Sequence, residues 1–360
     1  MLYLITFCVF TLSQPNTGIF PEESWQETNP ESQGIDPAKL SSAMDYLQTG
    51  FKDHGGIETV AIIRNGYLIW KGSEVEKEYL LFSATKSFTS TVLGLLIDDG
   101  KITLDTYARD YSQSLVELYP DVKIRHFATM TSGYDANIEK GYEPDSQGRS
   151  DSWNPDPPSA PLFPPGTKFR YWDEAMMQFG KVLTNVAGEP LDRIFKRRIA
   201  DPIGMTKWKW QPHDSPNGRI LNWTGGIRTN SLELARFGHL FLSKGNWKGN
   251  QLISEKWVNM ATTVQVPNSI PNDEVPRSRG SGNYGFNWWV NGIKSDGHRM
   301  WDGAPPRTYL AHGLHANLCI IIPEWNMVIT RTNADDSPDN FDEIMSNFFD
   351  MLAKAVSVED

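Results

Sequence analysis

Sequence typical of β-strands occurs near both ends of this 360-residue chain, and helical periodicity fills most of the length between them. Near the start, residues 59–72 form two β-rich runs joined by Asn65 and Gly66, a dipeptide that strongly favours a hairpin turn. Strand-like runs return at residues 284–291, 307–313, 318–323 and 326–333. The pattern predicts one sheet assembled from distant segments, with a helical insertion beside it.

Helical periodicity is clearest in a few longer segments. Helices are predicted at residues 37–51, 85–98, 173–188, 231–245 and 340–355. The helix from residue 37 has Asp36 as its expected N-cap and Pro37 in its first turn. It therefore has a well-defined start.

The charge of the chain limits its partners. Its net charge is −10, and it has no run of five or six Lys or Arg residues. This composition argues against nucleic acid or anionic lipid as a partner. We expect a small ligand that is neutral or cationic, or binding without electrostatic preference.

The first 15 residues have part of the pattern of a signal peptide. The apolar stretch from Leu2 to Leu12 has the length of a signal-peptide core, but a basic start and a clear cleavage site are missing. We treat residues 1–15 as a candidate signal peptide and expect a secreted or periplasmic protein. The alternative is an apolar N-terminal strand or a misassigned start in a cytoplasmic protein. No later apolar run reaches about 18 residues, so no membrane span is predicted.

Ser83 is the only serine in the chain with a lysine, Lys86, three positions later. Residues i and i+3 share a face of a helix, so the Lys86 amine is expected to reach the Ser83 hydroxyl. A serine becomes a useful nucleophile when a neighbouring base takes its proton, and a lysine that is neutral can act as that base. The alternative interpretation is a helix cap followed by an exposed lysine.

Blocks of sequence along nearly the whole chain resemble the serine β-lactamase-like hydrolases, which include class C β-lactamases, D-Ala-D-Ala carboxypeptidases, esterases and 6-aminohexanoate-dimer hydrolases. The blocks occur in the family's order and include FSATKS, FATMTSGY, PPGTKFRYWDEA, GGIRTNSLELARFG and AHGLHANLCIIIPE. The resemblance implies an α+β fold of the β-lactamase/transpeptidase type, with an antiparallel sheet flanked by helices. Residues 22–102 and 258–360 would form the α/β region, and residues 103–257 the helical region.

The resemblance also assigns a second catalytic group. Tyr171 matches the tyrosine of the family's YxN motif, which implies a general acid/base beside Ser83. Where the family has asparagine, this chain has Asp173. A carboxylate near Lys86 would keep that lysine charged and shift proton abstraction toward Tyr171. The alternative is that Asp173 caps the helix that follows and points away from the site.

The third motif of the family, KTG, corresponds here to Ala311, His312 and Gly313. The resemblance implies that Gly313 allows close backbone approach and that the Leu314 N–H joins the Ser83 N–H in an oxyanion hole. Because the lysine and threonine are replaced, recognition of an anionic substrate end should be weak. His312 or His315 would restore part of it when protonated, unless these are ordinary histidines satisfied by backbone groups.

These features together predict a serine hydrolase that cleaves an ester or a linear amide through an acyl-enzyme. A class C-type β-lactamase or D,D-peptidase is the alternative, and a non-catalytic penicillin-binding or scaffold protein is the alternative of another class. Motifs for metals and nucleotides, such as HExxH and GxGxxG, are absent from the sequence, so no cofactor is predicted. Of the neighbours Trp288 and Trp289, at most one should reach the cleft, because adjacent strand residues face opposite sides.

Overall fold

The computed structural model describes residues 18–135, 159–210, 213–215, 218–220, 226–275 and 279–356. The candidate signal peptide, residues 1–15, lies outside these residues. None of the helices in the described part is long and apolar enough to cross a membrane.

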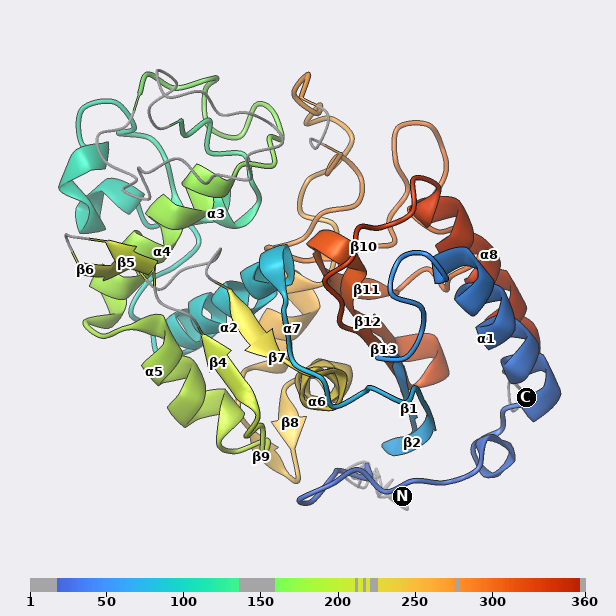
Figure 1. Ribbon diagram of the computed structural model, residues 1–360. Helices are drawn as coiled ribbons and strands as arrows, with labels where there is room; N and C mark the ends of the chain where they lie inside the picture. Colours follow the sequence, from blue (N-terminus) through green and yellow to red (C-terminus); the bar gives the residue numbers. More distant parts are fainter. Residues whose placement is uncertain are drawn as a thin grey trace, which may run out of the picture.

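A six-stranded antiparallel sheet forms the centre of the fold (Figure 1). Its strand order is β10-β11-β12-β13-β1-β2, so the N-terminal hairpin pairs with a strand from the far end of the chain. Asn65 and Gly66 both have positive φ angles in the turn of that hairpin, as a two-residue primed turn requires. The strands are β1 (Ala61–Arg64), β2 (Tyr67–Lys71), β10 (Trp289–Val290), β11 (Tyr309–Gly313), β12 (Asn317–Ile322) and β13 (Met327–Arg331). The expected antiparallel sheet is confirmed.

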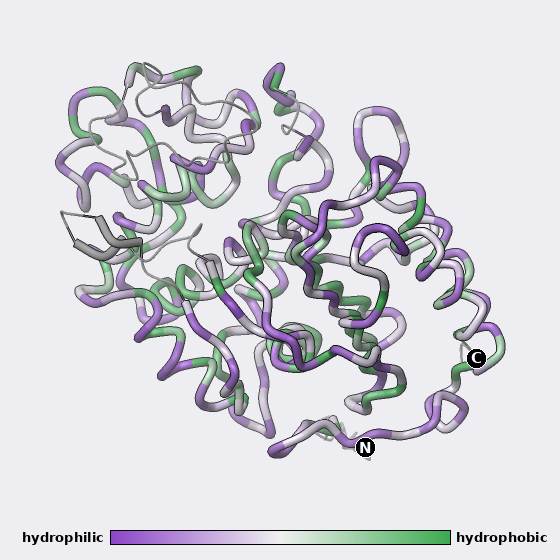
Figure 2. The backbone as a smooth tube through the Cα atoms, viewed as in Figure 1, coloured by the Kyte–Doolittle hydropathy of each residue, from purple (hydrophilic) through white to green (hydrophobic). Residues whose placement is uncertain are grey.

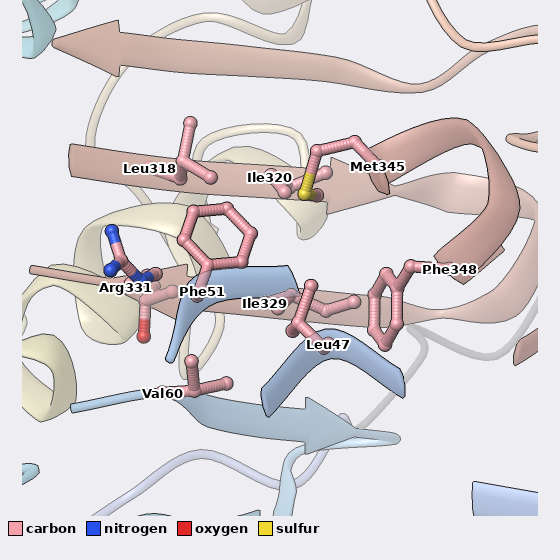
Figure 3. A pocket seen from close by; sticks show the side chains of 10 residues that line it. Leu47, Phe51, Val60, Leu318, Ile320, Ile329, Arg331, Met345 and Phe348 are labelled. Atoms are coloured by element: carbon pink, nitrogen blue, oxygen red, sulfur yellow. The ribbon is translucent and has the colours of Figure 1, made fainter. Parts of the chain in front are cut away.

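Two helices cover one face of this sheet: α1 (Pro37–Phe51) and α8 (Phe341–Ala355). Asp36 caps α1 by accepting hydrogen bonds from the N–H groups of Ala38 and Lys39. Hydrophilic and hydrophobic residues alternate along both helices in Figure 2, as expected for helices with one apolar face. Side chains of both helices and of the sheet line a small pocket in the layer between them (Figure 3).

The other face of the sheet packs against α6 (Ser231–Leu242), and α2 (Thr85–Asp98) lies in the same core. The rings of Phe88 on α2 and Phe237 on α6 stack with centroids 4.0 Å apart. Every residue of α2 from Thr85 to Leu96 is buried, including several hydroxyls that donate to backbone carbonyls. This central helix therefore has a fixed position.

The remaining elements lie mostly on the α2 side of the molecule (Figure 1). The helices there are α3 (Ile124–Ala128), α4 (Asp173–Ala187), α5 (Leu191–Phe195), the π-helix η6 (Lys196–Ala200) and α7 (Glu255–Ala261). The short strands are β3 (Tyr79–Leu80), β4 (Trp208–Trp210), β5 (His213–Ser215), β6 (Gly218–Ile220), β7 (Ile227–Thr229), β8 (Asn246–Trp247) and β9 (Asn250–Gln251). The 3₁₀ turns are η1 (Pro30–Gln33), η2 (Phe82–Ala84), η3 (Ala108–Tyr111), η4 (Gln113–Leu115), η7 (Leu314–Ala316) and η8 (Pro323–Trp325).

Candidate active site

Ser83 lies in the 3₁₀ turn η2, directly before the central helix α2. The Lys86 Nζ is 2.7 Å from the Ser83 Oγ and donates a hydrogen bond to it. Ser83 is partly exposed, whereas Lys86 is only 1% exposed. The alternative of an exposed lysine after a helix cap is therefore wrong, because α2 carries Lys86 into the core.

Asp173, the first residue of α4, faces the same lysine. Its Oδ1 lies 2.9 Å from the Lys86 Nζ, with the two side chains 9% and 2% exposed. No side chain caps α4, so Asp173 does not serve as the N-cap. A buried ammonium is costly without an opposite charge, and Asp173 supplies that charge.

Tyr171 completes the cluster through its ring. The Lys86 Nζ lies 4.7 Å from the centroid of the Tyr171 ring. The same ring stacks on Trp289 with centroids 5.7 Å apart. The neighbouring Trp288 is fully buried and stacks on Phe237, so only Trp289 reaches the site, as the strand alternation predicts.

The C-terminal end of β11 lies directly against the turn that holds Ser83. A Cβ atom added to Gly313 would lie 1.9 Å from the Leu81 O and 3.0 Å from the Ala84 N. Only a residue without a side chain allows this approach. Leu314 follows as the first residue of η7, which brings its peptide group to the edge of the Ser83 turn.

The two candidate histidines lie in different places, and the structure does not bring His312 into the cluster. Strand alternation puts His312 on the sheet face opposite to Ala311 and Gly313, where its ring stacks on Phe341 at the start of α8. Burial there lowers the pKa of His312 to about 4, so it is neutral at pH 7. The expectation that a protonated His312 helps to bind an anionic substrate end is therefore wrong.

His315 lies nearer to the Ser83 turn. Its ring packs edge-on against the ring of Phe82, with centroids 5.0 Å apart. Its Nδ1 is 3.1 Å from the Oδ1 of the exposed Asp336. The side chain of His315 thus borders the turn and has a carboxylate partner of its own.

Two residues beside the cluster were not predicted from the sequence. Glu174 follows Asp173, and burial, then the negative charge of Asp173, raises the pKa of Glu174 to about 7. Tyr284 is fully buried and packs edge-on against the rings of Tyr171 and Trp289. The position of Glu174 directly after Asp173 could have indicated it, whereas no sequence pattern indicates Tyr284.

Metal ligands do not gather in the described residues, where no three His, Cys, Asp or Glu side chains are placed to hold an ion. The buried Lys86 Nζ contacts both the Ser83 Oγ and the ring of Tyr171, and this arrangement fits proton transfer to and from a serine hydroxyl.

Comparison with known proteins is consistent with this arrangement. Residues 58–346 match the family model described as Beta-lactamase. The 6-aminohexanoate-dimer hydrolase of Paenarthrobacter ureafaciens is 24% identical over 276 residues, which cover 68% of this chain and 70% of that protein. Among solved structures, the "Putative 6-aminohexanoate-dimer hydrolase from Bacillus anthracis" has a TM-score of 0.70 at 17% identity and covers 94% of this chain and 90% of its own. EstCE1, a hydrolase with promiscuous acyltransferase activity, has a TM-score of 0.65 at 18% identity, with 89% and 98% covered.

The structural likenesses show the fold, which is of the β-lactamase/transpeptidase type with an antiparallel sheet and flanking helices. The family model spans more than half of the chain and includes the blocks that carry Ser83, Lys86, Tyr171 and Gly313. The chain therefore belongs to the beta-lactamase family.

Proposed function

We propose that this protein is a serine hydrolase that cleaves an ester or a linear amide through an acyl-enzyme on Ser83. The observation that carries the proposal is the 2.7 Å hydrogen bond between the Lys86 Nζ and the Ser83 Oγ, at a lysine that the core encloses. Burying a lysine costs free energy, and placing it against a serine hydroxyl gains little stability. The pair is better explained by chemistry than by packing.

In the first half of the reaction, the Ser83 Oγ attacks the substrate carbonyl carbon while its proton passes to the Tyr171 phenolate. The N–H groups of Ser83 and Leu314 hold the resulting oxyanion. Collapse of the tetrahedral intermediate breaks the C–O or C–N bond, and Tyr171 returns the proton to the leaving alcohol or amine. In the second half, water gives a proton to Tyr171 and attacks the acyl group, after which the proton returns to Ser83 and the acid departs.

Asp173 determines how this work is divided between the lysine and the tyrosine. The Asp173 Oδ1 lies 2.9 Å from the Lys86 Nζ, so the two side chains form a buried ion pair. We therefore assign to Lys86 an electrostatic role, in which its charge stabilises the Tyr171 phenolate 4.7 Å away, measured to the ring centroid. Tyr171 then acts as the general acid/base.

The residues around Gly313 support a neutral substrate rather than an anionic one. Ala311 replaces a cationic side chain of the family motif, and His312 lies uncharged on the other face of the sheet. The net charge of −10 adds a general repulsion of anions. Esters and linear amides without a carboxylate next to the scissile bond are thus favoured over penicillins and D-Ala-D-Ala peptides.

The test uses a fluorophosphonate probe and p-nitrophenyl esters with the wild type, Ser83→Ala and a matched control, Ser90→Ala. Ser90 is a buried serine of the same helix, and its Oγ donates to the Phe286 O. We expect labelling and turnover in the wild type and the control and neither in Ser83→Ala.

Each other outcome has a defined meaning. Turnover that persists in Ser83→Ala excludes Ser83 as the nucleophile. A wild type that is neither labelled nor active favours the non-catalytic scaffold protein. Rapid cleavage of nitrocefin, against slow ester turnover, favours the β-lactamase alternative.

A further inference from the structure

The turn between β11 and β12 has an unusual backbone for the residues that form it. His315 and Ala316 have φ angles of 63° and 52°, in the left-handed region that residues with a side chain rarely adopt. Two consecutive non-glycine residues in this region require support from the surrounding structure. The turn begins at Leu314, whose N–H is assigned above to the oxyanion hole.

Arg331, the last residue of β13, provides much of that support. Its Nη1 donates to the His315 O at 3.0 Å and to the Ala316 O at 3.2 Å. Its Nε and Nη2 donate to the carbonyls of Gly56 and His54, in the loop that follows α1. The guanidinium thereby links the turn to a separate and well-packed part of the fold.

The side chain of Arg331 is itself held in place. It is 3% exposed, and its guanidinium lies 4.4 Å from the centroid of the Phe51 ring. Burial lowers the pKa of Arg331 to about 10, so the side chain stays charged at pH 7. Burying a cation costs desolvation free energy even when it donates to four carbonyls. An apolar side chain would fill this position at lower cost if only packing were needed.

Asn317 holds the remaining carbonyl of the turn. Its Nδ2 donates to the Leu314 O at 2.7 Å and to the Asn333 O at 3.0 Å, and its Oδ1 accepts from the Asn333 N. The side chain is fully buried. The carbonyls of three consecutive residues, from Leu314 to Ala316, therefore all accept hydrogen bonds from buried side chains.

We infer that Arg331 is a positioning residue for the oxyanion hole: by fixing the carbonyls of His315 and Ala316, it sets the position of the Leu314 N–H relative to Ser83. The inference rests on the function proposed above. Arg331 is buried and its guanidinium donates to backbone carbonyls, so we expect its effect to reach the reaction through the turn. The fork of the guanidinium matters, because a lysine in its place has one nitrogen and cannot reach both the turn and the loop after α1.

The experiment compares the wild type with Arg331→Lys and Arg331→Met, using p-nitrophenyl ester turnover normalised to the sites labelled by a fluorophosphonate. Removing an oxyanion donor lowers kcat by about 10²-fold to 10³-fold. We expect kcat to fall about 100-fold in Arg331→Met and about 10-fold in Arg331→Lys, with KM within about threefold of the wild type in both.

Arg236→Met is the matched control. Arg236 is also buried and donates to three carbonyls, those of Ile203, Glu22 and Glu23, but it holds the N-terminal arm against α6. Its loss is expected to lower the melting temperature and to leave kcat per labelled site unchanged. If Arg331→Lys and Arg331→Met also keep wild-type kcat per labelled site, the positioning role is refuted and only a structural role remains.

Amide hydrogen exchange of a peptide that covers residues 309–322 tests the inference without turnover. We expect this peptide to exchange at least tenfold faster in Arg331→Lys than in the wild type, whereas Arg236→Met leaves it unchanged. Equal exchange in the wild type and Arg331→Lys overturns the inference even if the enzyme proposal fails. If Arg331→Met does not fold, Arg331→Lys, which keeps the charge, carries both measurements.

Discussion

Glu174 allows a quantitative test of the electrostatics beside the cluster. It is the second residue of α4, next to Asp173, and its Oε2 is buried without a hydrogen-bond partner. Burial is the main cause that raises the pKa of Glu174 from 4.5 to about 7, and the negative charges of Asp173 and Asp135 add to it. If Asp173 were neutral, part of this shift would be missing.

The shift translates into a dependence of stability on pH. Each pKa unit corresponds to about 1.4 kcal/mol, so a rise from 4.5 to about 7 amounts to roughly 3 kcal/mol. The folded protein keeps the Glu174 proton at pH values where the unfolded chain has lost it. Glu174 therefore costs no stability below about pH 4.5, and its penalty grows as the pH rises and is complete above about pH 7.

Replacing Glu174 with glutamine removes this penalty and keeps the shape of the side chain. We expect Glu174→Gln to match the wild type in free energy of unfolding at pH 4 and to exceed it by roughly 3 kcal/mol at pH 8. Urea unfolding at pH 4, 6 and 8 measures the difference, and other groups cancel because both proteins carry them. Glu117→Gln, at an exposed glutamate, is the control and should show no such trend. A gain for Glu174→Gln that is absent, or the same at pH 4 and pH 8, would refute the reasoning.

Further predictions concern the groups around the candidate nucleophile. Tyr171→Phe should lower kcat/KM of ester hydrolysis by about 10²-fold or more with little change in melting temperature, because the phenyl ring keeps the aromatic packing and loses only the hydroxyl proposed to transfer the proton. Activity near that of the wild type would exclude the acid/base role. Asp173→Asn should lower the free energy of unfolding at pH 7 by about 3 kcal/mol, because it leaves Lys86 buried without an opposite charge. Urea unfolding measures this free energy, and a value equal to that of the wild type would contradict the prediction. Gly313→Ala should abolish most turnover and lower the free energy of unfolding by about 1–3 kcal/mol, because the added Cβ would lie 1.9 Å from the Leu81 O and force β11 away. A variant with the stability and kcat of the wild type would show that β11 approaches the Ser83 turn less closely.

The part of the site that depends on local spacing could be predicted from the sequence. The i, i+3 spacing of Ser83 and Lys86 is a property of the chain alone. Ser83 lies in the 3₁₀ turn before α2 and Lys86 in α2, and the two groups are 2.7 Å apart. The strand patterns at the two ends of the chain predicted one sheet built from distant segments, whereas its antiparallel type was implied by the family resemblance. The start of α1 followed from its capping signal, Asp36.

The side-chain directions in the β11 segment were harder to predict. The family motif fixes the register of Ala311, His312 and Gly313 but does not state which side chains reach substrate once two of them have changed. Alternation along the strand sends His312 toward Phe341 and α8. For Asp173 the sequence left two directions open, and only the packing of α4 against α2 decided between them. The carbonyl acceptors of Arg331 lie 15 or 16 and 275 or 277 residues away in the sequence, and no local pattern indicates them.

The energetics of the buried ion pair explain why such a costly cluster is consistent with function. At 2.9 Å and an effective dielectric constant of about 20, the attraction between Lys86 and Asp173 is roughly 6 kcal/mol. Desolvating the two charges costs several kcal/mol for each ion, so the pair yields little or no net stability, and apolar residues of similar size would serve the core at least as well. Apolar residues in these positions would not supply a fixed positive charge beside a serine hydroxyl and a phenol ring. Because that charge is the property that a proton-transfer site needs and a core does not, the ion pair argues for chemistry at Ser83 independently of the family resemblance.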